Sequence, residues 1–323
     1  MSVTLRGLTA ADIPAWNVLL ADIERVEQIG EHYNEADLAE EMANSEIDPV
    51  QDMVGAFHDE TMVGYFTVYP RTATDECHKV SLEGAVHPEW RGSGIGTELA
   101  TAMMQRAASV HAERHPQVPA LYTLNGPSAN ADQADLLARV GLRPERWSFV
   151  MRAVLGNAAT PDALPEGLEL RRYDATCARA MRDAHNAAFM DHPNFTPWSE
   201  LMWRERVVES RNFRPGLSFV VVDANVPDQV AAYVQTNEYD AYLEVTGRRE
   251  AYVAKVGTRR EHRGRGLASA LLQHCLQACQ AAGYDEAALD VDSENPTGAL
   301  GVYERAGFVV ESKLTDFALL SDS

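Results

Sequence analysis

Cysteine is scarce in this sequence, whose 323 residues contain only Cys77, Cys177, Cys275 and Cys279. The last two lie at the i,i+4 spacing of one helix face, where a small buried side chain is the ordinary role of cysteine. Neither a disulfide framework nor a cysteine metal site is therefore expected. The chain is predicted to work in a reducing compartment, the cytoplasm.

Positive charge is also scarce. The sequence has 28 Lys and Arg against 48 Asp and Glu, a formal net charge of −20. This argues against a general binder of nucleic acid or of anionic membranes, since both are polyanions. It is compatible with a cationic small-molecule partner, although solubility alone would also explain it. No apolar run is long enough to cross a bilayer, and the start of the chain lacks the pattern of a signal peptide. We therefore expect a monomer or homodimer with no nucleic-acid or membrane partner.

One pattern of strands and helices occurs twice along the chain. The length favours two domains, and similar phrases open the two halves, VTLRGLTAADI at 3–13 and LELRRYDATCA from residue 168. Each half then has two strand-like runs around a polar turn. The runs are residues 53–57 and 62–69 in the first half, and 218–224 and 229–236 in the second. Repetition on this scale indicates two copies of one domain.

Each of these hairpins is followed by a strand, a glycine-rich turn and a helix, and then by a short strand and a second helix. Gly141 and Gly307 close the second helices, at the position where a left-handed residue is common. Residues 156–167 are rich in Pro, Gly and Ala and are typical of a linker. The sequence therefore predicts an α/β protein of two tandem domains, 1–155 and 168–323, each a central mixed sheet flanked by helices.

The glycine turns, WRGSGIG at 90–96 and HRGRGLA at 262–268, indicate anion binding. A strand that ends in glycines and opens a helix leaves backbone N–H groups unpaired at the positive end of the helix dipole. Glycine also lets a phosphate approach the backbone without meeting a Cβ atom. Neither turn has the pattern of a P-loop, and Ser269 stands where a dinucleotide fingerprint would have its third glycine.

Both turns resemble the R/Q-x-x-G-x-G/A motif of the GCN5-related N-acetyltransferases, the GNAT family. The order of strands and helices matches as well, so the resemblance covers nearly the whole chain in two copies. It implies a GNAT fold in each domain and acetyl-CoA as cosubstrate, with the pyrophosphate on the backbone amides of the turn. The residues implied to bind the cofactor are Val86, Arg91, Gly92, Gly94, Ile95 and Gly96 in the first domain, and Val256, Arg263, Gly264, Arg265, Gly266, Leu267, Ala268 and Asn295 in the second.

A cluster of arginines, Arg259, Arg260, Arg263 and Arg265, marks the second turn. Coenzyme A carries a pyrophosphate and a ribose phosphate, so local positive charge would offset the repulsion expected from an acidic chain. The alternative is that these arginines are solvated surface residues. Asn295 also has two interpretations, as a ligand of the cofactor's amide groups or as a helix cap.

Acetyl transfer to an amine needs a base for the amine, a donor to the carbonyl oxygen and an acid for the leaving thiolate. In the family that the sequence resembles, a carboxylate on the strand before the turn serves as base, a backbone N–H on that strand stabilises the oxyanion, and a tyrosine before the Gly-Phe pair serves as acid. Glu250 and Tyr303 match the two side-chain positions. The alternatives are a charged residue at a strand entry for Glu250 and a core aromatic for Tyr303.

The first half lacks both side chains. Aligning AVHP at 85–88 with KVGT at 255–258 places Val80 where Glu250 stands, and Leu137 occupies the tyrosine position. We therefore predict that the first domain is degenerate and binds acetyl-CoA, supports the fold, or does both. The second domain is predicted to be catalytic.

The acceptor is expected to be a primary amine of a small polar metabolite or antibiotic-like compound. Candidate residues of its pocket are Asp290, Trp198, Asp240 and Tyr242, because carboxylates beside aromatic rings suit a cationic amine. The alternative is that the tryptophan is core and the acids are surface. The tandem layout also resembles the mycothiol synthases, a group within the family that acetylates the cysteine amine of a glycosylated inositol. Asp290 stands where that group has a tyrosine.

Two other functions stay open, a non-catalytic acyl-CoA sensor and an acetyltransferase of protein N-termini or lysines. The presence of Glu250 together with Tyr303 argues against the sensor, and the negative charge would suit a basic peptide. His111 and His115 have the i,i+4 spacing of a metal-binding pair. Because no third ligand is apparent in the sequence, we predict a solvated helix face and no metal site.

Overall fold

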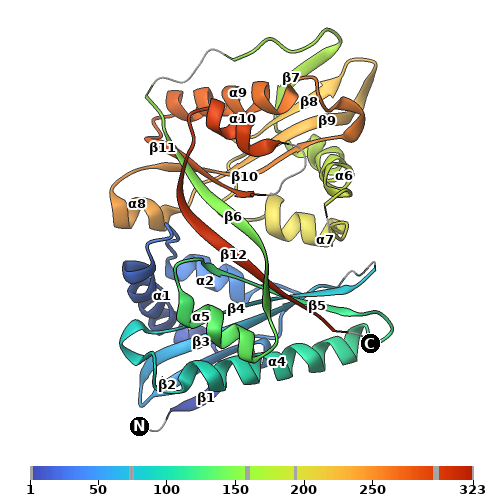
Figure 1. Ribbon diagram of the computed structural model, residues 1–323. Helices are drawn as coiled ribbons and strands as arrows, with labels where there is room; N and C mark the ends of the chain where they lie inside the picture. The colour runs from blue at the N-terminus through green and yellow to red at the C-terminus, as the bar shows by residue number, and fades with distance from the viewer. Residues whose placement is uncertain are drawn as a thin grey trace. The chain divides into compact units, whose positions relative to one another are not determined.

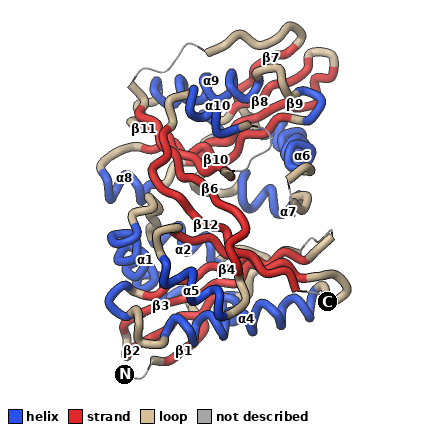
Figure 2. Tube along the Cα trace, in the orientation of Figure 1, coloured by secondary structure: helices blue, strands red, loops and turns tan. Residues whose placement is uncertain are grey.

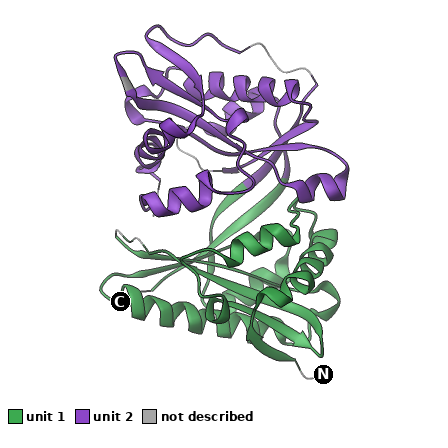
Figure 3. Cartoon of the chain, turned by 180° about the vertical axis from the view of Figure 1, so that it is seen from behind, with its two compact units in different colours: residues 1–148, 312–323 green, residues 149–311 purple. Residues whose placement is uncertain are grey.

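The computed structural model describes residues 3–72, 74, 76–156, 161–192, 195–293 and 298–321. The chain forms two compact units (Figure 1, Figure 3). Unit 1 comprises residues 1–148 and 312–323, and unit 2 comprises residues 149–311. Each unit contains a mixed β-sheet with helices packed on it (Figure 2), which confirms the predicted fold class.

The sheet of unit 1 has one parallel pair of strands at its centre. Its spatial order is β1, β2, β3, β4, β5, β12. Strands β4 and β5 are parallel, and the other neighbours are antiparallel. The bounds are β1 (Thr4–Gly7), β2 (Met53–His58), β3 (Thr61–Pro70), β4 (His78–Val86), β5 (Ala120–Pro127) and β12 (Val309–Ser321). The helices are α1 (Ile13–Glu27), α2 (Glu35–Met42), α3 (Pro49–Asp52), α4 (Ile95–Arg114) and α5 (Ala131–Arg139).

Two apolar layers hold unit 1 together. Helix α4 presents Ile95, Leu99 and Met103, a stripe with helical spacing, to a core shared with β4 and β5. Helix α1 contributes a second stripe, which includes Trp16 and Leu19, to a separate core with β2 and β3. The core with α4 includes Val80 and Leu82 of β4, and Ala85 of the same strand packs against the core with α1. Helices therefore hold β4 from both sides, and the strand leads into the glycine turn.

The sheet of unit 2 repeats this plan. Its spatial order is β6, β11, β10, β9, β8, β7. Strands β10 and β11 are parallel, whereas β7, β8, β9 and β10 pair in antiparallel fashion. The bounds are β6 (Arg143–Val154), β7 (Leu168–Arg172), β8 (Phe219–Asp223), β9 (Val226–Asn237), β10 (Glu250–Thr258) and β11 (Glu286–Asp292). The helices are α6 (Ala178–Phe189), α7 (Glu200–Trp203), α8 (Asp240–Thr246), α9 (Leu267–Ala281) and α10 (Ala299–Arg305).

Short turns connect these elements. The 3₁₀ turns are Ala10–Asp12, Pro88–Trp90, Ala175–Cys177, Pro215–Leu217 and Arg260–His262, and a π-helical turn spans Arg204–Val208. Gly141 and Gly307 follow α5 and α10 with φ of 98° and 93°, as predicted for the residue after a helix. Both hairpins also form within a few residues of the predicted bounds, as β2–β3 and β8–β9.

The last strands of the two sequence halves differ from the predicted boundaries. The prediction placed 149–155 in the first domain and 312–323 in the second, whereas contacts assign 149–155 to unit 2 and 312–323 to unit 1. Residues 314–321 of β12 pair with 120–127 of β5, and Met151 of β6 belongs to the core that contains α9. The apolar alternation of a strand fixes which face it buries but does not encode the strand it will pair with.

The assignment of β12 to unit 1 predicts which unit is destabilised when a core side chain of this strand is truncated. Phe317, 3% exposed, is part of the unit 1 core, so Phe317→Ala should destabilise that core by about 3 to 5 kcal/mol. Hydrogen exchange followed by mass spectrometry should show faster exchange in β5 and α4, with little change in β10 and α9. Leu320→Ala on the same strand is the control, because Leu320 is 60% exposed. Faster exchange concentrated in 149–311 would contradict the assignment.

Candidate active site

The two glycine turns have the same backbone geometry. Gly94 caps α4 with φ of 91°, and Gly266 caps α9 with φ of 77°. A Cβ atom added at either glycine would meet no heavy atom within 4 Å. The turns are therefore open on the side from which a ligand can reach the first backbone N–H groups of the helix, as an anion cradle requires.

One arginine braces each turn in the same way. Arg91 donates from Nε to the carbonyl of Val86 at 3.2 Å, and Arg263 donates from Nε to the carbonyl of Thr258 at 3.3 Å. Each guanidinium also reaches back to the helix that opens its half of the sequence. Arg91 pairs with Glu27 at 2.7 Å. These motif arginines therefore stabilise the connection between strand and turn.

In unit 2 that brace includes Asp191, which the sequence analysis missed. Arg263 donates to Asp191 at 2.7 Å and to the carbonyl of Ala188 at 2.7 Å, and Arg260 also pairs with Asp191. Hydrogen bonds from these two guanidiniums hold the pKa of the Asp191 carboxyl below its usual range. Only the fold could reveal this partner, because it is more than 60 residues away in sequence.

The other two arginines of the cluster have different contacts. Arg259 donates to the carbonyl of Val230 at 2.8 Å, and the guanidinium of Arg265 lies 3.2 Å from Nδ1 of His262. Arg265 is exposed. A phosphate role for the cluster stays a prediction, and among these four side chains Arg265 suits it, because it is exposed and, unlike Arg260 and Arg263, does not pair with Asp191.

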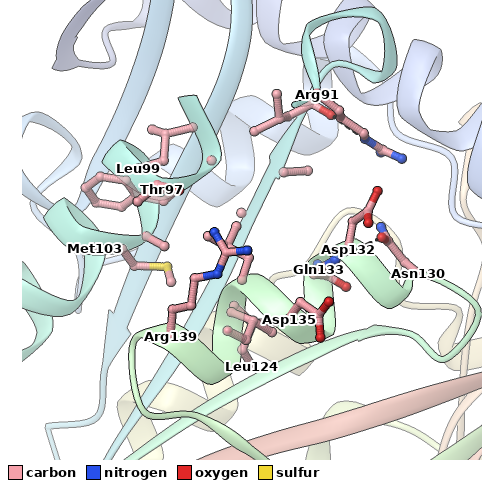
Figure 4. A pocket seen from close by; sticks show the side chains of 18 of the residues that line it. Arg91, Thr97, Leu99, Met103, Leu124, Asn130, Asp132, Gln133, Asp135 and Arg139 are labelled. Carbon is pink, nitrogen blue, oxygen red and sulfur yellow. Dashed lines mark hydrogen bonds between the residues drawn. The ribbon is translucent and has the colours of Figure 1, made fainter. Parts of the chain in front are cut away.

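Unit 1 contains a cavity of about 510 Å³ beside its glycine turn (Figure 4). Its apolar part is lined by Phe66, Leu99, Met103, Leu124 and Leu137. Its polar part includes Gly92 and Gly94 of the turn, together with Glu27, Arg91, Asn130, Asp132, Asp135 and Arg139. Figure 4 shows α4 and α5 on two sides of this space, with the side chains of Arg139 and Met103 directed into it.

Both parallel strand pairs part before they reach the turn. Strands β4 and β5 pair from His78–Ala120 to Leu82–Leu124, although β4 continues to Val86. Strands β10 and β11 pair only from Glu250–Glu286 to Tyr252–Ala288, although β10 continues to Thr258. Parted strands expose backbone groups along the inner edges of the gap.

Strand β10 also has an irregularity that β4 lacks. Its register against β9 shifts between Val253 and Lys255, so Ala254 has no paired residue on β9. The pairing of β3 with β4 runs without a shift from Gly64–Val86 to Pro70–Val80. An extra residue of this kind leaves a backbone N–H outside the ladder and bends the strand.

Glu250 lies at the start of β10 and is 7% exposed. Arg152 donates to its Oε2 from Nε at 2.8 Å and lies within 2.7 Å of the same oxygen through Nη2. Burial raises the pKa of Glu250 to about 7, against the opposing effect of Arg152. A carboxyl group with this pKa exchanges a proton near neutral pH, which a general base must do.

Tyr303 lies on α10, with its ring 6.1 Å from that of Phe308. Burial raises the pKa of its phenol to about 12, so the group is protonated at neutral pH. Its hydroxyl makes no hydrogen bond with a residue in the described part of the chain, which leaves the proton available to a ligand. Val256 packs on the same core as Tyr303, so both lie on the α9 face of the sheet.

The remaining predicted cofactor residues surround the two turns. Leu267 and Ile95 are buried first residues of α9 and α4. Gly96 lies against α5, because an added Cβ would be 3.0 Å from Leu136. Gly92 and Gly264 both have positive φ, whereas Ala268 and Val86 are half-buried. Asn295 lies outside the described residues.

The four predicted acceptor residues make separate contacts. Asp290 accepts from the hydroxyl of Tyr252 at 2.9 Å, and Asp240 pairs with Arg211 at 3.3 Å. The ring of Trp198 lies 4.9 Å from Nζ of Lys255. Tyr242 is 8% exposed and belongs to the surroundings of Glu250, because its hydroxyl donates to Glu286 at 2.6 Å and Arg152 lies over its ring.

The strand alignment of the two halves differs from the sequence prediction. Parallel pairing begins at His78 in β4 and at Glu250 in β10, and the two arginine braces reach the last residue of each strand. His78, two residues from Val80, therefore occupies the Glu250 position. The sequence alignment was off by two residues because it matched strand ends by residue type, although it was correct that a carboxylate is missing there. Leu137 is a core residue at 2% exposure.

His78 also approaches His111 of α4 and His115, the residue that follows this helix. Its Nδ1 lies 3.0 Å from Nδ1 of His111, and its Nε2 lies 2.9 Å from the carbonyl of Arg71. The histidine pair therefore has a third histidine beside it, which was not apparent in the sequence. The ring nitrogens of His78 are already occupied by these contacts, and among the described residues no group of His, Cys, Asp and Glu has the arrangement of a metal site.

Comparisons with known proteins agree with this geometry. Residues 178–308 match the Acetyltransferase (GNAT) family and residues 2–143 match the Acetyltransferase (GNAT) domain. A mycothiol acetyltransferase of Nocardia farcinica is 31% identical over 257 residues, 78% of each chain. One of Mycolicibacterium paratuberculosis is 30% identical over 274 residues, 80% of this chain and 79% of the relative.

Solved structures show the same tandem fold. A GCN5-related N-acetyltransferase from Sphaerobacter thermophilus has a TM-score of 0.79 at 24% identity and covers 99% of this chain and 96% of its own. A tandem GNAT protein from the clavulanic acid biosynthesis pathway has a TM-score of 0.69 at 16% identity, covering 100% and 99%. The chain belongs to the acetyltransferase (GNAT) family. It is an N-acetyltransferase, with acetyl-CoA as its acetyl donor.

The residues present fit this donor. Both glycine turns offer open backbone N–H groups, and the cavity of unit 1 continues from its turn into apolar surroundings. Within the described residues, no helix is both long enough and apolar enough to cross a bilayer.

Two arginine variants separate bracing from phosphate binding. Arg263→Met removes the contacts with Thr258, Ala188 and Asp191, and it should lower the melting temperature as well as the affinity for CoA. Arg265→Met should leave the melting temperature unchanged and weaken CoA binding by about tenfold, the size expected for one charge-assisted contact. Calorimetry with CoA and dephospho-CoA would check this. Equal affinity of the wild type for both ligands would exclude a role in reading the ribose phosphate.

Proposed function

We propose that unit 2 transfers the acetyl group of acetyl-CoA to a primary amine of a small polar, cationic metabolite or antibiotic-like compound. The observation that carries the proposal is the register shift of β10 beside its parting from β11. It stands between Glu250 on the same strand and the glycine turn at the end of that strand. Unit 1 has the turn and the parting, but β4 pairs with β3 without a shift.

The shift supplies a donor for the developing negative charge. The backbone N–H of Ala254, outside the β9 ladder, is proposed to donate to the oxygen that becomes anionic during transfer. Bound acetyl-CoA supplies the thioester carbonyl at that place. A fixed backbone donor needs no reorganisation when the charge forms, which is why it accelerates the step.

The proton transfers are assigned to Glu250 and Tyr303. Glu250, ionised above a pKa of about 7, takes a proton from the ammonium form of the acceptor, directly or through water. The amine nitrogen then forms its bond to the carbonyl carbon while the carbon–sulfur bond breaks. Tyr303, protonated with a pKa of about 12, gives its proton to the sulfur. The nitrogen loses its second proton as the amide forms, and this proton returns through water to the phenolate of Tyr303.

Unit 1 is proposed to hold acetyl-CoA without turning it over. Its cavity supports binding, but Leu137 and His78 replace the acid and the base. The surroundings of the turn in unit 1 are also acidic. Glu27 forms an ion pair with Arg91, and the carboxylates of Asp132 and Asp135 line the cavity. These acids would weaken the hold on a phosphate relative to the second turn.

A second candidate acceptor follows from the relatives. Mycothiol acetyltransferases about 30% identical to the chain match it over most of both lengths, so the reaction that gives them their name is the first specific assay to run. The broader amine class is preferred because Asp290, which accepts from the hydroxyl of Tyr252 on β10, adds a carboxylate to the surroundings of that strand, which suits a cationic acceptor. An amine library assayed by thiol release would decide between the two.

The assignment of Tyr303 as the acid makes a prediction about rates. Tyr303→Phe should lower kcat about ten- to a thousandfold with little change in the KM for acetyl-CoA, the pattern of a group used mainly in the transition state. Tyr173→Phe is the control, because Tyr173 is a buried tyrosine of unit 2 whose hydroxyl has no protein partner among the described residues. Near-native rates in Tyr303→Phe would show that another group protonates the sulfur.

The assignment of Glu250 as the base predicts how kcat/KM for the amine depends on pH. Its pKa is raised, so the base is ionised above about pH 7 and protonated below it. The kcat/KM for the amine should rise with pH through a midpoint near 7, and Glu250→Gln should remove that limb and lower the rate. A wild-type profile without this limb, or a Gln variant that keeps it, would assign the base elsewhere.

The inequality of the units can be tested with a matched pair of glycines. Gly266→Val and Gly94→Val introduce the same strain, because both residues have positive φ and both are open in space. Gly266→Val should abolish turnover by excluding the cofactor from unit 2. Gly94→Val should retain chemistry, with any loss of rate following the loss of melting temperature. Abolished turnover in Gly94→Val with an unchanged melt would place the first turn in the reaction.

A further inference from the structure

The contact between Arg152 and Glu250 leaves the two carboxylate oxygens of Glu250 in different states. Both short contacts of Arg152, at 2.8 and 2.7 Å, are made to Oε2. Oε1 makes no hydrogen bond with a described residue. The two side chains are only 11% and 7% exposed, so the pair is held in an environment where charge–charge attraction is strong.

The groups around this pair would otherwise oppose the ionised form of Glu250. Glu286 is its partner in the parallel register with β11, and Glu311 lies on the other side of Arg152 as a second ion-pair partner. Tyr242 places its ring under Arg152 and donates to Glu286, and Arg248 pairs with Glu286 at 2.6 Å. Among these neighbours, Arg152 is the cation in direct contact with Glu250.

Burial and nearby carboxylates both favour the protonated form of a carboxyl group. The pKa of Glu250 is raised by burial and by Glu286 and Glu311, and is lowered by Arg152. Without the guanidinium, Glu250 would be protonated at neutral pH and free to change rotamer. A protonated or misdirected carboxyl group cannot take a proton from the acceptor amine.

We propose that Arg152 is a positioning residue for catalysis: it fixes Glu250 through Oε2 so that Oε1 is the oxygen that takes the proton from the amine. This inference rests on the proposed function, in which Glu250 is the base. In this proposal Arg152 acts through Glu250 and is assigned no contact of its own with the acceptor or the cofactor. Its guanidinium keeps the same two donors on Oε2 while the proton arrives at Oε1, so the carboxyl group is charged and oriented before the amine binds.

The experiment compares the pH dependence of kcat/KM for the amine in Arg152→Met, Arg152→Lys and the wild type. Arg152→Met should move the midpoint of the acidic limb upward by about one to three pH units, the effect expected when an adjacent opposite charge is lost. At pH 7 the rate should fall about 10- to 1000-fold and should recover in large part at high pH. Arg152→Lys keeps the charge but cannot provide the paired donors, so its shift should be smaller.

Two further variants control for folding. Arg214→Met removes another arginine of unit 2 that pairs with a carboxylate, Glu238, at 2.8 Å, and its limb should not move. Glu311→Gln removes a negative charge at a side chain that is 42% exposed, and its limb should move slightly downward, opposite to Arg152→Met. This variant tests the proposal even if Arg152→Met fails to fold.

The outcomes separate the inference from the function on which it rests. If Glu250→Gln retains the wild-type rate and limb, the assignment of the base fails. If Glu250→Gln is inactive but Arg152→Met and Arg152→Lys lose the same fraction of activity at every pH, Arg152 has only a structural role and the inference is overturned. The inference is supported if the midpoint of the acidic limb moves to higher pH in Arg152→Met and to lower pH in Glu311→Gln.

Discussion

Two parallel strands that pair for only a few residues and then part create, in each unit, the gap around which the other elements are arranged. The parting frees backbone groups that a regular sheet would consume in its ladder. It places the end of one strand beside the first turn of a helix, where further N–H groups have no partner. The separate core with α9 holds that end of the sheet of unit 2. A ligand with a long polar chain and a phosphate can then form hydrogen bonds with the unpaired strand backbone, while its phosphate binds the free N–H groups of the helix.

The two units share this arrangement but differ in the residues that the proposed reaction would use. Both retain the arginine that ties the turn to the end of the preceding strand, because that tie serves the fold whether or not a reaction follows. The features that differ are the register shift in β10 and the side chains at the positions of Glu250 and Tyr303. A single extra residue in a strand changes which backbone donors face the gap, and Leu137 in place of a phenol removes a proton source. In the proposed reaction, binding and turnover are carried by different residues of one scaffold.

Much of this could be read from sequence because it is local. The hairpins, the glycine turns and Gly141 and Gly307 follow from residue type and spacing within a few positions. Arg152 and Asp191 could not be found in this way, because each acts through a partner more than 60 residues away in the chain. The position of His78 was missed for a related reason. The register of a strand is set by its neighbours, so residue type at its end gave an offset of two.

The exchange of final strands also bears on how such a chain can be divided. Cleavage within residues 156–167 would separate two sequence repeats, yet neither fragment would be a complete domain. The first would lack the β12 segment that pairs with residues 120–127 of β5, and the second would lack Met151 and Ala153 from its core. Each fragment would present an unpaired sheet edge, the feature most prone to intermolecular pairing. The two repeats therefore depend on each other for a complete sheet, and a cut between them in the sequence is not a cut between domains.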